Sequence, residues 1–523
     1  MDVRTESKTG PLVAPLPTVL QTVAEQLRTQ QPAWLEQLTA HPECFADLEV
    51  QVHQTFQHCA DQVVAALLAQ ASQQSPRLEV LKKKVIDQAP KPLRAPEARP
   101  LMIRLLGGLV LWVTTCYCGP QARKGRGRGK EGSGLYPELA ALGIDEGASP
   151  ALVSLVGRMT ALLPSYEVAR DELFLRGLPL DVKVVHRMGR HLGAELLATR
   201  TRDLQAYRAG LMPVGQDLAG YRVGVAEDGG RVRTRIVIRK QKGRGKQKTR
   251  RRRFRVEWRE PKLLIIFKMD ERGRMIPGSR CWIDGTFKGP DELMELLAMH
   301  LHRLGAVQAQ VVVFLSDGAP WIWERLEWVE KRVGLAADRV KRVLDWCHAV
   351  HHVSLALGKL GLDDAARRTL FKQMRRKVRA GQTEAVIADL RARAGPETKE
   401  KDSVWTEIRF LQKHALAGHM DYKEFRKAGV PIGSGAIESA IRRVINLRLK
   451  GNGLLWKEAN AEGMIVLRAA ALTRQWRETL EHVRESMASN RRLDWKWQSP
   501  DMPAQLEVQL LIGPPEPQVQ AGQ

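Results

Sequence analysis

Three acidic residues of this 523-residue chain stand where a chemical site can form. Asp228 ends the apolar segment VGVAED, and Asp317 ends VVVFLSDG, the most apolar segment that we predict as a strand. Glu438 stands near the start of the helix that we predict in PIGSGAIESAIRRVI. Ligand sites form at strand ends of α/β sheets because side chains leave the core there. Three carboxylates that converge at such an edge suit two Mg²⁺ or Mn²⁺ ions and phosphodiester chemistry.

Each of these acids also has a plain structural interpretation. Asp228 precedes a glycine, which is a typical hairpin-turn dipeptide, and Asp317 precedes a glycine at a strand-to-helix corner. Glu438 and Arg442 are four residues apart on a predicted helix and could form a surface ion pair. Taken one at a time, these interpretations are the simpler ones, but the three acids share one strand–strand–helix order within a strongly basic segment.

The charge balance points to a polyanion as partner. Lys and Arg number 83 against 58 Asp and Glu, which gives a net charge of +25. Ten of the fifteen residues at 239–253, RKQKGRGKQKTRRRR, are basic, and a run this dense predicts contact with nucleic-acid phosphates. The Gly-rich basic run at 123–130 is typical of a flexible loop. From the denser run we select five residues as DNA contacts: Arg244, Arg250, Arg251, Arg252 and Arg253.

Residues 149–205 have the outline of a helix-turn-helix unit. We expect helices from Pro150 and from Ser165, and a basic third helix in DVKVVHRMGRHLG after Pro179. A helix, a short turn with glycine and a basic second helix are the outline of a DNA-reading motif. The alternative, an ordinary helical hairpin with solvated charges, is equally compatible with the pattern. The side chains that would face DNA are Lys183, His186, Arg187 and Arg190.

Composition excludes several classes of protein. A hydrophobic content of 44% with 27% charged residues is ordinary for a globular chain, and six Cys are too few for a disulfide scaffold. The start MDVRTESKTG lacks the apolar core of a signal peptide, and the longest apolar run, at 105–115, is too short to cross a bilayer. We therefore expect a cytoplasmic protein without a membrane segment. The Cys and His spacings predict no structural zinc, and no phosphate-binding loop indicates a nucleotide cofactor.

Periodicity divides the chain into a helical start, a strand-rich centre and a helical end. After 215 we expect antiparallel strands, a helix, the strand at 310–318, a second helix and a strand at 340–346, which together predict a mixed sheet. Residues 1–16 have the composition of a loose leader. The expected units are 1–100, helical with a Pro-rich linker; 101–148, a strand segment and the basic loop; 149–205, the helix-turn-helix-like unit; 215–348, an α/β domain; 349–430, a helical insertion; 431–482, the final helices of that domain; and 483–523, a tail.

Several long segments in this order resemble one family of enzymes. These segments are VAEDGGRVRTR, WREPKLL, IDGTFKGPDEL, VVVFLSDGAPWIWERL, VLDWCHAVHH and PIGSGAIESAIRRVINLRLKGNGLLW. They look like a DDE transposase of the Mutator-like kind, in its bacterial insertion-sequence branch, over roughly residues 150–475. The resemblance implies an RNase H-like catalytic domain with a mixed five-stranded sheet. It also implies that the first acid lies on the first strand, the second after the fourth strand, and the third on a late helix beyond a helical insertion.

The resemblance assigns roles to particular residues. Asp228, Asp317 and Glu438 would be the catalytic triad that binds Mg²⁺ or Mn²⁺, and Asp345 with His348 fits the family's Cys/Asp-x-x-His motif, with His348 near the scissile phosphate. The basic residues after the third acid would line the DNA path: Arg442, Arg443, Arg448 and Lys450. The implied partners are the terminal inverted repeats and the target DNA, bound by a homo-oligomer in the nucleoid. The implied reaction is cleavage of the DNA ends followed by strand transfer.

Two alternatives to this assignment stay open. Asp284 in CWIDGTFKG also follows a strand-like segment and rivals Asp228 as the first acid; we prefer Asp228 because it lies on the first strand. The function itself has two rivals, a transposase-derived DNA-binding repressor that no longer cleaves DNA and a metal-dependent nuclease without strand transfer.

Overall fold

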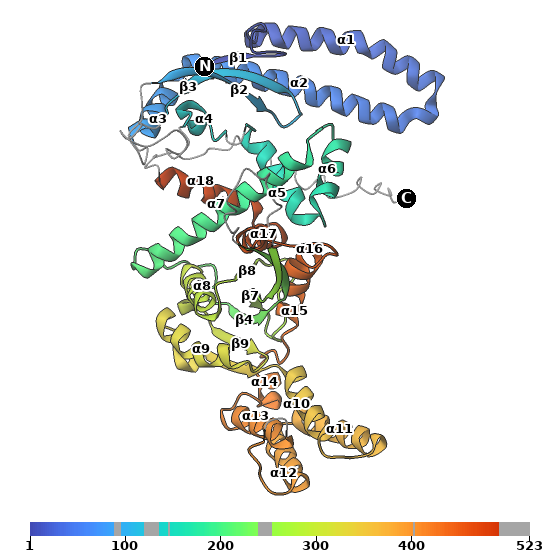
Figure 1. Ribbon diagram of the computed structural model, residues 1–523, viewed down its shortest axis with the longest axis vertical. Helices are drawn as coiled ribbons and strands as arrows, with labels where there is room; N and C mark the ends of the chain where they lie inside the picture. The colour runs from blue at the N-terminus through green and yellow to red at the C-terminus, as the bar shows by residue number, and fades with distance from the viewer. Residues whose placement is uncertain (88–95, 120–134, 145–146, 239–253, 401–402, 491–523) are drawn as a thin grey trace, which may run out of the picture.

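The computed structural model describes residues 1–87, 96–119, 135–144, 147–238, 254–400 and 403–490. The molecule is elongated and has several domains (Figure 1). The N-terminal helices and a small sheet lie at one end, a five-stranded sheet with its helices lies in the middle, and a helical unit forms the other end. Among the described helices, none is both long enough and apolar enough to cross a membrane.

The N-terminal region combines a helical hairpin with a three-stranded sheet. Its helices are α1 (Leu16–Ala40), the 3₁₀ turn η1 (Pro42–Cys44), α2 (Phe45–Gln74) and α3 (Pro76–Asp87). Its strands are β1 (Asp2–Arg4), β2 (Glu97–Arg104) and β3 (Val110–Tyr117), in the order β1-β3-β2. The expectation that residues 1–16 form a loose leader is wrong, because β1 pairs with β3 and the Val3 side chain is buried in the core of this sheet.

Short helices then lead into the longest helix of the centre. After α4 (Pro137–Ala141) come α5 (Pro150–Leu162), α6 (Tyr166–Leu175) and α7 (Val182–Arg208). The side chains of Ser149, Ser165 and Asp181 each accept a hydrogen bond from a backbone N–H in the first turn that follows, which is why the three helices begin there. The predicted helix starts are confirmed. The C-terminal part of α7 packs on α17 and on the central domain, so this helix joins the two regions.

A mixed five-stranded sheet forms the centre of the molecule, as predicted. Its strands are β4 (Arg222–Gly229), β7 (Lys262–Met269), β8 (Cys281–Thr286), β9 (Val311–Ser316) and β10 (Val340–Leu344), in the order β10-β9-β4-β7-β8. Strands β4, β9 and β10 are parallel to one another, and β7 runs antiparallel to β4 and to β8. The apolar sequences of β7 and β9 are buried on both faces because helices cover both sides of the sheet.

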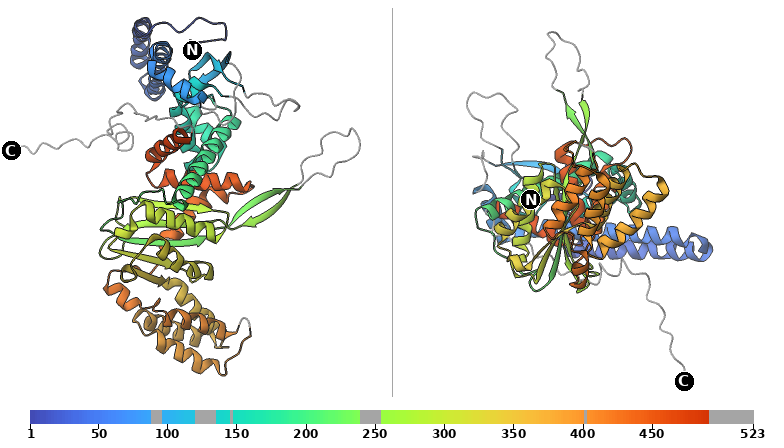
Figure 2. Two further views of the ribbon diagram at one scale, coloured as in Figure 1. Left: turned by 90° about the vertical axis from the view of Figure 1, so that its left-hand side faces the viewer. Right: turned by 90° about the horizontal axis from the view of Figure 1, so that it is seen from below.

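The segment RVRTRIVI at 231–238, among the antiparallel strands expected after 215, belongs to a separate ribbon. Strands β5 (Val232–Val237) and β6 (Phe254–Arg259) pair only with each other among the described strands and project from the sheet (Figure 2). β4 pairs instead with β7, the next long apolar segment. Outside the sheet, Val237, Phe254 and Val256 of the ribbon are each about half exposed, whereas almost every residue of β7 is buried.

Helices cover the two faces of the sheet unequally. α8 (Pro290–Arg303) and α9 (Pro320–Val333) pack on one face, with the short turns η2 (Ala306–Gln308) and η3 (Ala337–Arg339) beside them. The other face lies against part of α7 and the late helices. These are α15 (Gly435–Ile441), the π-helical segment η4 (Arg442–Asn446), α16 (Leu447–Leu449), α17 (Glu458–Leu472) and α18 (Trp476–Asn490).

A helical unit is inserted between β10 and α15, where an insertion was predicted. It contains α10 (Trp346–Gly358), α11 (Asp364–Arg379), α12 (Thr383–Ala394), α13 (Val404–Leu416) and α14 (Tyr422–Lys427). α13 and α11 both pack on α10. Since α10 begins directly after β10, the whole unit extends from the strand ends of the sheet (Figure 1).

Candidate functional site

Three aspartates lie where three neighbouring parallel strands end: Asp228 near the end of β4, Asp317 directly after β9 and Asp345 directly after β10. The ladder between β4 and β9 joins residues 89 positions apart, beginning with Arg222 and Val311, and Asp317 lies 89 positions after Asp228. The ladder between β9 and β10 joins residues 28 positions apart, and Asp345 lies 28 positions after Asp317. Continued by two residues past the first ladder and by one past the second, this register brings the three aspartates side by side on one face. The aspartates therefore form a row, the acidic edge, where the strands end.

Asp228 is partly buried and lies beside a second negative charge. Its Oδ1 accepts a hydrogen bond of 2.6 Å from the backbone N–H of Gly229. Burial and the charge of Asp317 raise the pKa of Asp228, while that hydrogen bond and the positive charges of His348 and Lys262 oppose the rise. The structure therefore brings Asp228 and Asp317 together, and it places Asp228 on a paired strand rather than in a hairpin turn.

The turn after β9 holds Asp317 in place. Asp317 Oδ1 accepts a 2.9 Å hydrogen bond from the backbone N–H of Ala319, just before α9. Gly318 has a φ of +92°, and a Cβ at this position would lie 2.5 Å from the ring of Phe410 on α13. Only glycine fits both constraints. The helical insertion thus touches the turn that carries the second predicted acid.

Asp345 connects the acidic edge to two helices. Its Oδ1 accepts a 2.8 Å hydrogen bond from the backbone N–H of His348, and His348 Nδ1 lies 3.0 Å from the same oxygen. Its Oδ2 accepts a 2.6 Å hydrogen bond from the backbone N–H of Ser434, directly before α15. The hydrogen bond with Asp345 raises the pKa of His348, and the charges of Asp317 and Asp228 add to the rise. The Asp-x-x-His motif therefore fixes the starts of α10 and α15 together.

Glu438 lies one turn into α15, next to this connection. The side chain is exposed, and the hydroxyl of Ser434 donates a 3.4 Å hydrogen bond to its Oε1. α15 packs on β4 and β7, so the helix crosses the sheet beside Asp228. No described contact joins the Glu438 carboxylate to Asp228 or Asp317. The structure thus places the third predicted acid near the acidic edge but not within it.

Glu227 is a buried carboxyl that sequence reasoning missed. It is 1% exposed, and neither side-chain oxygen has a hydrogen-bond partner among the described residues. Burial, together with the charge of Asp317, raises the pKa of Glu227 to about 8. Strand alternation turns it to the face opposite Asp228. Ser316, the last residue of the neighbouring strand β9, also has a buried hydroxyl for which the described residues provide no partner. A glutamate within the apolar run VGVAE was the available signal.

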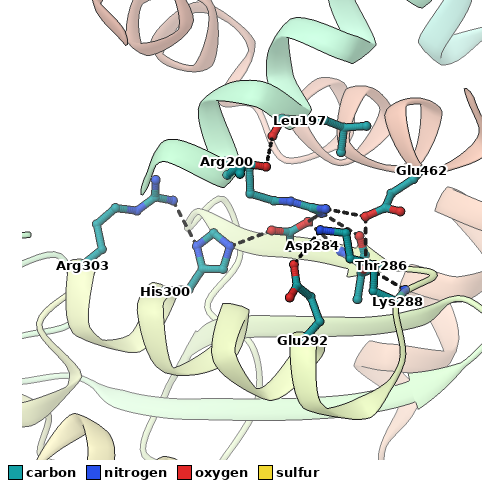
Figure 3. Close-up of polar contacts among 11 residues, drawn as sticks. Leu197, Arg200, Asp284, Thr286, Lys288, Glu292, His300, Arg303 and Glu462 are labelled. Atoms are coloured by element: carbon teal, nitrogen blue, oxygen red, sulfur yellow. Dashed lines mark hydrogen bonds and ion pairs between the residues drawn. The ribbon is translucent and has the colours of Figure 1, made fainter. Parts of the chain in front are cut away.

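Asp284, the rival of Asp228, belongs to a buried ion-pair network (Figure 3). Its Oδ1 lies 2.8 Å from Arg200 Nη1 and its Oδ2 lies 2.9 Å from His300 Nε2. Arg200 also contacts Glu462 on α17 at 2.5 Å, and Glu462 accepts a 2.9 Å hydrogen bond from Thr286. Burial disfavours the charge of Asp284, but Arg200 and His300 outweigh burial and hold its pKa well below the usual range. Both oxygens of this carboxylate are engaged, and its network ties α7, β8, α8 and α17 together.

The oxygen donors at the acidic edge suit a hard cation. Asp228 and Asp317 each use one oxygen for a backbone hydrogen bond, and the second oxygen accepts none from the described residues. Two adjacent carboxylates with free oxygens match the ligands that Mg²⁺ prefers. Nevertheless, within the described ranges no three His, Cys, Asp or Glu side chains are arranged as a complete metal centre. The pair fits part of such a centre, and Glu438 would have to approach to extend it.

The basic residues predicted to bind DNA fall into three groups. Lys183, Arg187 and Arg190 are exposed along the first turns of α7, with the partly buried His186 between them. Arg442 and Lys450 are exposed after Glu438, and Arg443 is partly buried. The remaining five lie outside the described residues: Arg244, Arg250, Arg251, Arg252 and Arg253.

Arg448 requires a correction. Its side chain is 1% exposed, and its guanidinium lies 4.8 Å from the ring centroid of Tyr166 and 5.3 Å from that of Trp456. Nε donates a 3.3 Å hydrogen bond to the backbone oxygen of Thr160 on α5. The side chain lies beneath the surface and joins α16 to the α5–α6 region, so Arg448 does not belong to a DNA-facing set.

Comparisons with known proteins do not identify this chain. No protein-family model matches the sequence, no curated protein matches it, and no solved structure matches the fold.

Proposed function

We propose that this protein is a DDE-type DNA transposase that binds the terminal inverted repeats of an insertion sequence, cleaves the DNA ends and joins them to target DNA. The observation that carries the proposal is the placement of Asp228 and Asp317 at the ends of adjacent parallel strands, close enough for the charge of Asp317 to raise the pKa of Asp228. A pair of carboxylates with free oxygens, in a chain of net charge +25, suits metal-assisted chemistry on a phosphodiester.

The topology supports an RNase H-like identity for the central domain. Numbered along the chain, the sheet strands have the order 5-4-1-2-3, with only the second strand antiparallel to the first. Asp228 lies on the first of these strands, Asp317 follows the fourth, and Glu438 follows a helical insertion. These are the places that the family resemblance implies. The ion pair of Asp284 with Arg200 and its contact with His300 favour Asp228 as the first acid, because both oxygens of Asp284 are already engaged.

In this proposal each side chain of the site has a separate task. Asp228 and Asp317 would hold Mg²⁺ or Mn²⁺, with Glu438 completing the site from α15 when DNA is bound. The ion would stabilise negative charge at the reacting phosphate and activate the attacking oxygen. His348, which carries a positive charge more readily because of Asp345, would contact that phosphate. Water would attack in cleavage and a 3′-hydroxyl in joining.

We assign α5, α6 and the first turns of α7 to DNA recognition, as a helix-turn-helix unit. Lys183, Arg187 and Arg190 are exposed on one helix that continues into the central domain. A rigid helix that carries both the basic residues and Arg200 of the buried network would hold bound DNA at a constant distance from the sheet. We also propose that the protein binds DNA as a homo-oligomer.

A cleavage and joining assay tests the proposal. Purified protein is incubated with Mg²⁺ and a labelled duplex that carries the end of the element bracketing its gene. We expect cleaved and joined products. Cleavage alone would instead identify a nuclease, and binding without cleavage a repressor.

Matched variants separate the chemistry from the binding. Asp317→Asn removes a charge from the acidic edge and should abolish both products while duplex binding persists. Asp338→Asn, an exposed aspartate in η3 after the next helix, removes the same charge away from the edge and should leave the products unchanged. Products from Asp317→Asn at the wild-type rate would refute the site.

A further inference from the structure

The helical insertion carries a basic helix that the sequence analysis did not single out. α11, DAARRTLFKQMRRKVR, contains seven Lys and Arg residues and one acid, Asp364. At 3.6 residues per turn, five of the cations fall within about 100° of one another around the helix axis. We call these five the basic stripe: Arg368, Lys372, Arg375, Arg376 and Arg379. The opposite side of the helix, with Met374 and Val378, is buried against the unit.

The basic stripe is exposed and has no acidic partners. All five side chains are exposed, and none forms an ion pair with a described carboxylate. Cations on neighbouring elements do have partners: Lys359 lies 2.6 Å from Glu407, and Arg393 lies 2.7 Å from Asp389. An unpaired row of like charges on one face destabilises the free protein, so a polyanion that neutralises the row gains affinity.

One end of the basic stripe lies beside the acidic edge. The guanidinium carbons of Arg375 and Arg379 lie 4.8 Å and 5.7 Å from the ring centroid of Trp346, the residue directly after Asp345. Arg375 is also close enough to Cys347 to act on its thiol electrostatically, as are Asp345 and Glu438. These cation–π contacts with Trp346 hold the C-terminal end of the stripe next to the acidic edge.

The dimensions of the basic stripe suit a duplex. From Arg368 to Arg379 the helix rises about 16 Å, and a DNA duplex carries roughly ten phosphate charges over that length. α11 lies at the margin of the helical unit (Figure 1), so a rod-shaped partner has access along its length.

We propose that the basic stripe of α11 binds the phosphate backbone of the double-stranded DNA that flanks the reacting bond. This proposal rests on the proposed function, since it names where the substrate of the same site continues. The stripe gives the protein a second DNA-binding surface on the helical insertion, in addition to the helix-turn-helix unit that precedes the sheet in the chain.

Two double variants of the same helix test the proposal. Arg368→Gln with Lys372→Gln removes two charges from the stripe. Arg367→Gln with Lys377→Gln removes one Arg and one Lys that are also exposed on α11 but lie outside the stripe. Binding of the full-length protein to a fluorescent 40-base-pair duplex of arbitrary sequence is measured by anisotropy at several NaCl concentrations, without divalent cations.

The salt dependence of binding is the decisive quantity. Each lost phosphate contact lowers the slope of log K against log[salt] by about 0.9, so the stripe variant should lose about 1.8. Between 50 and 200 mM salt the wild type should then weaken about 12-fold more than the stripe variant. The control variant should keep the wild-type slope, and so should Arg368→Lys with Lys372→Arg, which preserves both charges.

Each outcome decides one of the two proposals. Equal slopes for the stripe variant and the wild type overturn the role of α11, and so does an equal loss in the stripe and control variants, because charge alone would then explain it. Duplex binding by the wild type that does not depend on salt contradicts the proposed function itself. Thermal melting of each variant checks that the fold is intact.

Discussion

Replacing Arg200 by Met should destabilise the central domain strongly. The guanidinium lies between two carboxylates, Asp284 at 2.8 Å and Glu462 at 2.5 Å, and all three residues are less than 10% exposed. After the change Asp284 keeps His300 and a backbone N–H, whereas Glu462 keeps only the hydroxyl of Thr286. Most of the cost therefore falls on Glu462.

The magnitude follows from the charges left unpaired. Breaking a buried ion pair by removing one partner costs about 3–5 kcal/mol, and we expect about 4 kcal/mol for Arg200→Met. For a domain of this size 1 kcal/mol corresponds to a shift of about 2–4 °C, so the melting temperature should fall by roughly 8–16 °C. Differential scanning fluorimetry at pH 7 measures this shift.

A compensated variant and a pH series test the cause. Adding Asp284→Asn and Glu462→Gln to Arg200→Met removes the unpaired charges and should restore more than half of the lost stability. Because the folded pKa of Asp284 is depressed, the stabilising contribution of its ion pair is present above the unfolded pKa of about 3.9 and is lost as the pH falls further. The gap between wild type and Arg200→Met should therefore narrow below about pH 4. A cost under about 1 kcal/mol at pH 7 would refute the reasoning.

Three further predictions concern the site and its surroundings. The raised pKa of His348 should fall toward about 6.5 in Asp345→Asn, as NMR titration can measure. In the wild type the pair of His348 and Asp345 stabilises the fold below about pH 6.5, and this stabilisation is lost as the pH rises through the raised pKa. Arg448→Met should lower the melting temperature and leave the salt dependence of duplex binding unchanged. Lys450→Gln, at an exposed position, should leave the melting temperature unchanged and weaken the salt dependence. A weaker salt dependence in Arg448→Met would return Arg448 to the DNA path. Gly318→Ala should cost about 1–3 kcal/mol in thermal unfolding, because its φ is +92° and a phenyl ring occupies the space of the new methyl group; an unchanged melting temperature would contradict this.

Much of the architecture could be read from local patterns. The apolar run of β9 predicted a strand, and the residues at Pro150 and Ser165 predicted helix starts, because these signals depend on residues that are close in the chain. The placement of the ribbon β5–β6 was not predictable in this way. The alternating sequence of β5 is compatible with more than one antiparallel partner. In the structure β4 pairs with the more apolar β7, and β5 pairs with β6 outside the sheet.

The candidate site, too, was predictable from the sequence only in part. The acids at strand ends, the Asp-x-x-His motif and the large positive charge were predictable from the sequence, since all three are matters of residue type and spacing. The tertiary structure decided which carboxylates meet. The order of the strands places Asp228 beside Asp317, and Arg200 on a distant helix pairs with Asp284. Both depend on contacts between segments far apart in the chain, where side-chain charge and burial are set by neighbours that no local pattern specifies.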